Sequence, residues 1–194
     1  MANNSKLIGA DYLLLLLYLN NKEPIKSAVR ITKMMFLFNE EIVPLLKKKG
    51  VTLDEKDLPE FIAYNYGPFS KDLYEQIELF QNIGFIKVTD LYAKEEMDEA
   101  DDWEEESFID ELDSESTFTN RRDGKFIEYK LLVQGEKFVN NEIICQLTGE
   151  QIEILSAFKS RITETSVKSI LRYVYVKYPD KTENSFIKDE VLGQ

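Results

Sequence analysis

Residues 61–92 read FIAYNYGPFSKDLYEQIELFQNIGFIKVTDLY and decide the fold, because they place a turn, a helix and a strand in succession. The pair Gly67-Pro68 marks a turn, since both residue types interrupt regular structure. Apolar residues then recur at helical spacing, which predicts a helix over 69–83. The inner face of this helix carries Leu73, Ile77 and Phe80. A glycine ends the helix, and β-branched residues predict a strand over 85–92.

A second strand is predicted over 126–132, where Ile127, Tyr129 and Leu131 share one face. We expect the two strands to pair as a hairpin with residues 94–117 at its tip. That segment holds 13 acidic residues and one lysine, a net charge of −12. The whole chain also has a net charge of −12, from 24 basic and 36 acidic residues, so the other residues carry 23 charges of each sign. The acidity therefore belongs to one insertion, and repulsion between its like charges predicts a loop.

Two helices are predicted before this region. The eight apolar residues 12–19 predict a buried helix over 11–20, and they are too few to span a bilayer, which takes roughly 20. We therefore expect no membrane segment. A second helix begins near Ser27 as its N-cap, and Pro44 should kink or shorten it. The three lysines at 47–49 suit the negative end of that helix, with a phosphate-binding patch as the alternative.

The C-terminal residues are predicted to be helical. Thr148 and Gln151 form a capping box for a helix over 149–160. Thr165 is expected to cap a last segment that ends near Tyr178. Its β-branched and aromatic residues favour a strand, but the cap and the length favour a helix, which we prefer. The apolar surface of this segment is either buried or part of a homodimer interface.

These elements predict a mainly α fold of the α+β class. It is a winged-helix-like helical domain with a small β-hairpin wing and additional C-terminal helices. Residues 1–145 form the winged-helix-like domain, which includes a short helix over 134–141 and carries the acidic insertion 94–117 in its wing. Residues 146–194 form a helical part that packs on it.

The composition excludes several kinds of catalytic site. The sequence contains no histidine, which excludes mechanisms that need imidazole. Its one cysteine, Cys145, is flanked by apolar residues and is expected in the core. We therefore expect no enzyme activity, no cofactor, no resident metal and a cytoplasmic location. An enzyme would need a carboxylate metal site, and the spacing of Asp98, Asp102 and Glu106 supports only weak cation binding.

Three segments together resemble a known family. Residues 30–38, RITKMMFLF, are similar to a helix motif R-T-K-L-x-K followed by a hydrophobic residue. Residues 64–70, YNYGPFS, resemble an aromatic Y-G-P-x-S turn that opens a helix, and 84–86 with 129–135 are similar to G-L-I and Y-x-L-T-x-x-G. Over residues 10–140 the chain thus resembles the Panacea (SocA-like) antitoxin domain and the related YwgA-like winged-helix proteins of bacteria and phages. The resemblance implies a non-catalytic domain that binds another protein, often a toxin.

The residues that carry the turn and helix motifs are Arg30, Lys33, Tyr64, Tyr66, Gly67, Pro68 and Ser70. In physical terms, Gly67 permits a left-handed backbone, Pro68 suits the entry of a helix, and Ser70 is placed to cap it. The two tyrosines can pack against the start of that helix. An anion site at the helix N-terminus is the alternative. Leu132 stands where the family has Thr, which removes an N-cap from the helix behind the wing.

The acidic insertion is the candidate partner-binding segment. Its apolar anchors and the carboxylates beside them are Trp103, Phe108, Ile109, Leu112, Asp101, Asp102, Glu104 and Glu105. Acidic residues mixed with apolar anchors are typical of a segment that orders on a partner, with a solvated surface loop as the alternative. The expected partner is a toxin or a basic nucleic-acid-binding protein, whose basic cleft the insertion would occupy by mimicking nucleic acid.

The alternative function is that of a winged-helix DNA-binding transcriptional regulator. The helix before the wing would then enter the major groove, yet residues 70–83 carry a net charge of −2. The basic candidates are sparse for a chain with a pI of about 4.6: Arg30, Lys33, Lys47, Lys48, Lys49, Arg121, Arg122 and Lys125. Because phosphate neutralisation dominates nucleic-acid affinity, we expect a protein partner and no direct contact with nucleic acid.

Overall fold

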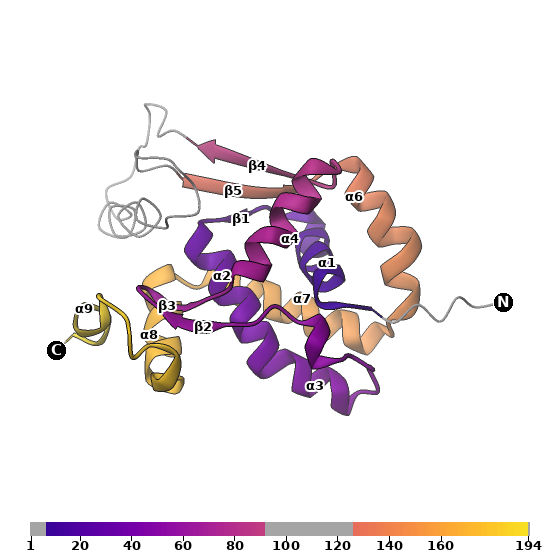
Figure 1. Ribbon diagram of the computed structural model, residues 1–194. Helices are drawn as coiled ribbons and strands as arrows, with labels where there is room; N and C mark the ends of the chain where they lie inside the picture. Colours follow the sequence, from indigo (N-terminus) through magenta and orange to yellow (C-terminus); the bar gives the residue numbers. More distant parts are fainter. Residues whose placement is uncertain (1–6, 92–125, 194) are drawn as a thin grey trace.

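A computed structural model describes residues 7–91 and 126–193 of the chain (Figure 1). It is mostly helical with a small antiparallel sheet, which confirms the expected mainly α class. The helices and strands are α1 (Gly9–Lys22), β1 (Ile25–Lys26), α2 (Ala28–Leu37), α3 (Val43–Lys48), β2 (Ile62–Tyr64), β3 (Gly67–Phe69), α4 (Lys71–Asn82), β4 (Ile86–Leu91), β5 (Phe126–Leu131), α6 (Val133–Phe138), α7 (Gly149–Glu164), α8 (Val167–Lys177) and α9 (Lys188–Leu192). The π turns are η1 (Phe38–Ile42) and η3 (Val139–Ile143), and the 3₁₀ turns are η2 (Glu55–Asp57), η4 (Ile144–Gln146) and η5 (Pro179–Lys181).

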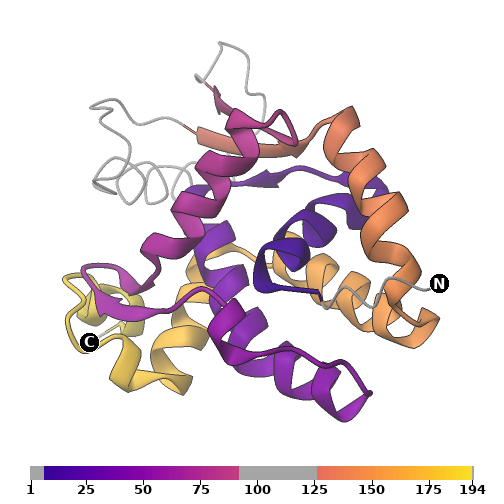
Figure 2. The same cartoon turned by 45° about the vertical axis from the view of Figure 1, so that its right-hand side comes forward.

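Helix α1 lies in the middle of the molecule, with the three-stranded sheet on one side and α7 on the other (Figures 1 and 2). Its central side chains, residues 12–17, are buried, as the uninterrupted apolar run predicts. Within the described parts of the chain, no helix is long and apolar enough to cross a bilayer. The first helix therefore serves as the hydrophobic centre on which the other elements pack.

The end of α1 is closed by a lysine from another helix. Residues 20–22 all have positive φ, so the chain turns sharply as the helix ends. The ammonium of Lys159, buried on α7, donates to Leu19 O at 2.7 Å and to Glu23 O at 2.8 Å. Burial lowers the pKa of Lys159 to about 8. A cation from α7 thus satisfies carbonyl groups that the irregular helix end leaves unpaired.

A π turn joins α2 to α3 and accommodates the proline in this long helical segment. Ser27 is the N-cap as predicted, because its Oγ accepts from the backbone N–H of Arg30 at 3.4 Å. At the other end, the Val43 N–H bonds to Phe38 O, five residues earlier. Pro44 follows directly and has no N–H for the regular ladder. The irregularity expected at this proline is therefore the π turn η1, after which the chain continues as α3.

The small sheet has the order β1-β5-β4, with both pairs antiparallel. Tyr129 of β5 lies opposite Val88 of β4 on one side and Ile25 of β1 on the other. The predicted inner face of β5 is confirmed, because Ile127, Tyr129 and Leu131 are all buried. The hairpin was expected, whereas β1 was not, since two residues are too few to show a strand pattern.

The C-terminal helices share the hydrophobic core of the N-terminal part. Helix α7 begins with the predicted capping box, in which Thr148 and Gln151 each accept the other's backbone N–H. It packs on α1 and α2, and α8 packs on α2. The segment that was ambiguous between strand and helix is the helix α8, with Leu171 and Val174 buried in the core.

Two local expectations are wrong and a third is confirmed. Cys145 is exposed and not in the core, because the turn η4 places it on the outer side while Ile143 is buried. Thr165 does not cap α8; Ser166 does, accepting from the Ser169 N–H at 3.1 Å. Leu132 is the N-cap of α6 and makes no side-chain cap hydrogen bond, as expected for a leucine at this position.

A methyl group added at Gly135 tests the packing of α6 on the hairpin. The new Cβ would overlap Phe85 O and lie 2.8 Å from Leu131 Cδ1. We expect Gly135→Ala to lower the free energy of unfolding by about 2–4 kcal/mol. Gly149→Ala is the matched control, since nothing lies within 4 Å of its Cβ position, and it should change stability by less than about 0.5 kcal/mol. Urea unfolding measures both; equal effects of the two variants would contradict this packing.

Candidate functional site

The sequence-predicted turn motif forms a tight antiparallel hairpin, β2–β3. Tyr64 pairs with Gly67, so the turn itself is Asn65-Tyr66 and Gly67 already begins the returning strand. The turn was expected one or two residues later, at Gly67-Pro68. Gly67 has φ +81°, and a Cβ there would lie 3.0 Å from a ring carbon of Tyr175. Glycine is thus required both for the backbone conformation and for the close approach of α8.

Lys33 of α2 forms hydrogen bonds with the turn and with strand β3. Its ammonium donates to Tyr66 O at 2.7 Å and to Pro68 O at 2.9 Å, one carbonyl on each side of Gly67. The residue is only 3% exposed on α2, and burial lowers its pKa to about 7. In the sequence, Lys33 and the turn belong to two separate motifs, more than thirty residues apart. The structure brings them into direct contact.

Two further motif residues act at helix ends. Ser70 caps α4 as predicted, with its Oγ accepting from the Leu73 N–H at 3.2 Å. This cap occupies a helix N-terminal donor that the alternative anion site would need. Arg30 lies apart from the hairpin and instead donates to the carbonyls that end α7, at 2.5 Å from both Ile162 O and Thr165 O. The motif residues therefore make structural contacts at three places, which are the turn, the start of α4 and the end of α7.

The outer surface of the hairpin carries a line of aromatic rings. Tyr64 and Phe69 lie 5.2 Å apart between ring centres, and Phe69 stacks on Tyr74 of α4 at 5.4 Å. Ile62 on the same strand is 52% exposed and Tyr64 is 38% exposed. Tyr66 of the turn is half-buried. Exposed aromatic and aliphatic side chains on a rigid backbone are typical of a surface that contacts another protein.

The C-terminal segment fixes the hairpin from the other side, which sequence reasoning missed. Asn65 O accepts from the Phe186 N–H at 2.9 Å and from the Ser185 hydroxyl at 3.1 Å. That hydroxyl also bonds the Tyr175 hydroxyl at 2.6 Å, and Lys181 donates to Phe61 O at 3.0 Å. The contacts of Phe61 O with Lys181 and of Asn65 O with Ser185 each join residues 120 positions apart, so no local sequence pattern predicts them. We call residues 62–69, held by Lys33 and by residues 181–186, the clamped hairpin.

The predicted partner-binding residues lie outside the described residues. They are Trp103, Phe108, Ile109, Leu112, Asp101, Asp102, Glu104 and Glu105. Among residues 7–91 and 126–193, no group of three or more His, Cys, Asp or Glu side chains is arranged to hold a metal ion. A groove of about 720 Å³ lies between η1, α3 and the segment 55–61. It is lined by charges of both signs, and the rim pair Lys47–Glu55 is joined at 3.0 Å.

Comparisons with protein-family models, with curated proteins and with solved structures gave no match for this chain. The site is therefore interpreted from its own geometry. That geometry presents a rigid hairpin with an exposed aromatic surface beside the helix α4. Such an arrangement is suited to binding a partner surface.

Replacing Lys33 by Met is expected to reduce the pH dependence of stability. A lysine in the unfolded chain has a pKa near 10.4, roughly three units above that of buried Lys33. Between these two values the unfolded chain binds more protons than the native chain, so the free energy of unfolding rises with pH. The rise is at most about 1.4 kcal/mol per pH unit from this one group.

Urea unfolding of the wild type and of Lys33→Met at pH 7, 8 and 9 measures this slope. Lys159 contributes a slope of its own in both proteins, because burial also lowers its pKa. The variant should therefore retain part of the pH dependence and lose the part that belongs to Lys33. An identical slope in the two proteins would show that Lys33 keeps an ordinary pKa.

Proposed function

We propose that the chain is a non-catalytic protein-binding module of winged-helix-like architecture, related to the Panacea (SocA-like) antitoxin domain. The order α1, α2, α4 and then the β4–β5 hairpin, with β1 added beside β5, supports this architecture. The contact of Lys33 with the carbonyls of the Y-G-P turn gives the two family motifs a common physical role. In this proposal the module acts in the cytoplasm, where its single exposed thiol stays reduced.

The acidic outer face of α4 is the observation that carries the proposal. This helix leads into the hairpin and would be the DNA-reading helix of a winged-helix regulator. Its exposed charges are one lysine and three carboxylates, and Lys71 is paired with Glu75 at 2.8 Å. Toward its C-terminal end the same helix exposes Leu79 (55%) and Ile83 (45%). Carboxylates beside exposed aliphatic side chains suit a protein surface and repel phosphates.

Four of the basic residues that could serve a nucleic-acid reader make contacts within the chain, while Lys48 is exposed. Arg30 and Lys33 point inward and donate to backbone carbonyls. On the surface, Lys47 pairs with Glu55 at 3.0 Å and Lys49 pairs with Glu150 at 2.5 Å. Arg121, Arg122 and Lys125 lie outside the described residues. These contacts favour a protein partner over DNA.

The charge of the chain indicates what kind of partner is favoured. Residues 94–117, which follow β4 in the sequence, account for the whole net charge of −12. A concentrated negative charge raises the association rate with basic surfaces. A toxin or a nucleic-acid-binding protein with a basic cleft is therefore the proposed partner class.

Affinity purification from the native host with variants of the full chain tests the proposal. Leu79→Asp places a charge on the outer face of α4 and should reduce recovery of the specific partner by about tenfold or more. Leu45→Asp is the matched control, because Leu45 is a similarly exposed leucine (38%) on α3. Deleting residues 94–117 should leave the melting temperature nearly unchanged and also weaken partner recovery.

The same proteins are assayed for DNA retardation at low salt with the native operon region. We expect no sequence-specific shift. Equal losses of partner with Leu79→Asp and Leu45→Asp, or a specific DNA complex, would contradict the proposal. The DNA complex would instead favour the transcriptional regulator.

A further inference from the structure

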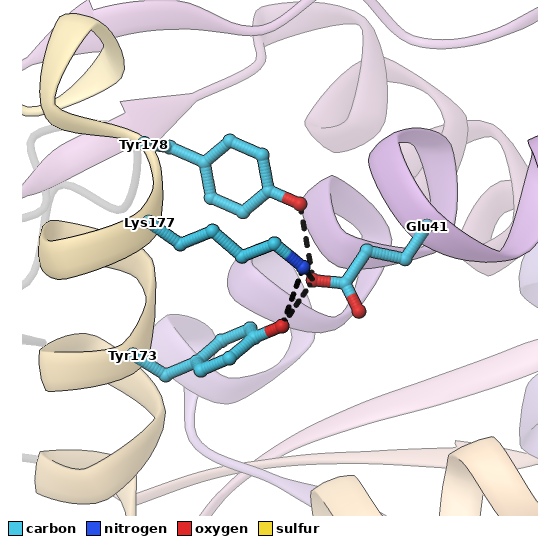
Figure 3. Close-up of polar contacts among 4 residues, drawn as sticks. All are labelled: Glu41, Tyr173, Lys177 and Tyr178. Carbon is cyan, nitrogen blue, oxygen red and sulfur yellow. Dashed lines mark hydrogen bonds and ion pairs between the residues drawn. The ribbon is translucent and has the colours of Figure 1, made fainter.

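A lysine ammonium lies beside two tyrosines and a glutamate where α8 meets the π turn η1 (Figure 3). Glu41 comes from η1, and Tyr173, Lys177 and Tyr178 come from the last turn of α8 and the residue after it. One carboxylate oxygen, Glu41 Oε1, accepts from the Tyr173 hydroxyl at 2.8 Å, the Tyr178 hydroxyl at 3.0 Å and Lys177 Nζ at 2.9 Å. The three donors thus converge on a single acceptor.

The ammonium lies near the hydroxyl ends of the two tyrosine rings (Figure 3). Lys177 Nζ lies 5.0 Å from the ring centre of Tyr173 and 5.5 Å from that of Tyr178. It also donates to the Tyr173 hydroxyl at 2.7 Å. Because Lys177 Nζ is so close to the Tyr173 hydroxyl, it lies near the edge of that ring and not over its face. The oxygen atoms of Glu41, Tyr173 and Tyr178 meet at this point, and we call these three residues the ammonium cage, which Lys177 fills.

The carboxylate of the cage is more buried than the ammonium that occupies it. The Glu41 side chain is 17% exposed, whereas that of Lys177 is 46% exposed and reaches the cage through a flexible stem. Partial burial raises the pKa of Glu41, but hydrogen bonds from Lys177 and the two tyrosines outweigh this effect and lower it. Helix α8 is anchored through other residues, since Leu171 and Val174 are fully buried. Lys177 is thus not required to hold the helix in place.

The surface beside the cage is apolar and open. On α8, Val176 is 66% exposed and Tyr173 is 43% exposed. The two residues are three positions apart, so they lie on neighbouring parts of one helix face. A partner that placed a cation in the cage would cover this apolar surface at the same time.

We propose that the ammonium cage is a binding site for a lysine side chain of the partner protein, and that Lys177 occupies it in the free chain. The inference rests on the proposed protein-binding function and names the partner chemistry that this surface fits. The observed occupant is itself a lysine ammonium, so the cage has the size and the acceptors that this group needs.

Lys177 competes with any external amine for the ammonium cage. A tethered side chain has a high effective concentration, so an external amine binds only to the fraction of molecules in which Lys177 is displaced. If Lys177 fills the cage in about nine molecules of ten, its removal strengthens external binding about tenfold. Stronger binding of an external amine after removal of Lys177 distinguishes a cation-binding site from a simple surface ion pair.

The test uses n-butylammonium as a probe for the lysine side chain, with NMR of labelled tyrosine rings as the readout. Lys177→Ala should bind the probe with saturable shifts of the two cage tyrosines and about tenfold more tightly than the wild type. Lys168→Ala is the matched control, because Lys168 is an exposed lysine on the same helix, and it should behave like the wild type. Adding Glu41→Gln to Lys177→Ala should abolish the gain.

Each contrary outcome overturns the inference. These outcomes are no saturable shift with Lys177→Ala, equal binding by the wild type, or the same gain with Lys168→Ala. Tighter binding of methylguanidinium than of n-butylammonium would overturn the assignment to lysine. Thermal melting checks that the variants are folded. Since the probe is a small amine, a negative result leaves the partner-recovery experiment intact, and the two proposals fail separately.

Discussion

The two hydrogen bonds from the buried ammonium of Lys33 to the carbonyls of Tyr66 and Pro68 are the contact on which the clamped hairpin depends. Tight turns leave carbonyl groups without ladder partners, and burying such groups unpaired is costly. This chain uses long cationic side chains to satisfy them. Arg30 does so at the end of α7, and Lys159 does so at the end of α1. Each of these cations lies on one element and closes a bend in another, so they also tie the helices together.

This use of cations has a consequence for the surface. The basic side chains of α2 are consumed in the interior, while the outer face of α4 keeps its carboxylates and its exposed leucine and isoleucine. Lys47 and Lys49 at the end of α3 are paired with Glu55 and Glu150. The cations of α2 thus face backbone carbonyls, while the carboxylates of α4 face solvent. That arrangement is poor for reading DNA and well suited to meeting a basic protein.

Much of the fold could be predicted, and the misses have a common physical cause. Helices with periodic apolar faces were located correctly, as Leu73, Ile77 and Phe80 of α4 show, because burial of one face is a local pattern. The β4–β5 hairpin followed from the same reasoning. Strand β1 and the contacts of the C-terminal segment were missed, because they are created by residues far apart in the sequence. The ammonium cage is similar, since Glu41 and Tyr173 are 132 positions apart. The candidate partner residues 101–112 lie outside the described residues, so their role stays a prediction.

The most direct test of the account is an NMR titration of Lys33 itself, following its side-chain Cε and Nζ signals in the full-length protein. The account predicts a midpoint near pH 7, as expected for an ammonium buried against Tyr66 O and Pro68 O with no carboxylate to stabilise its charge. A midpoint near the ordinary lysine value of about 10.4 would contradict burial of the ammonium without a compensating negative charge.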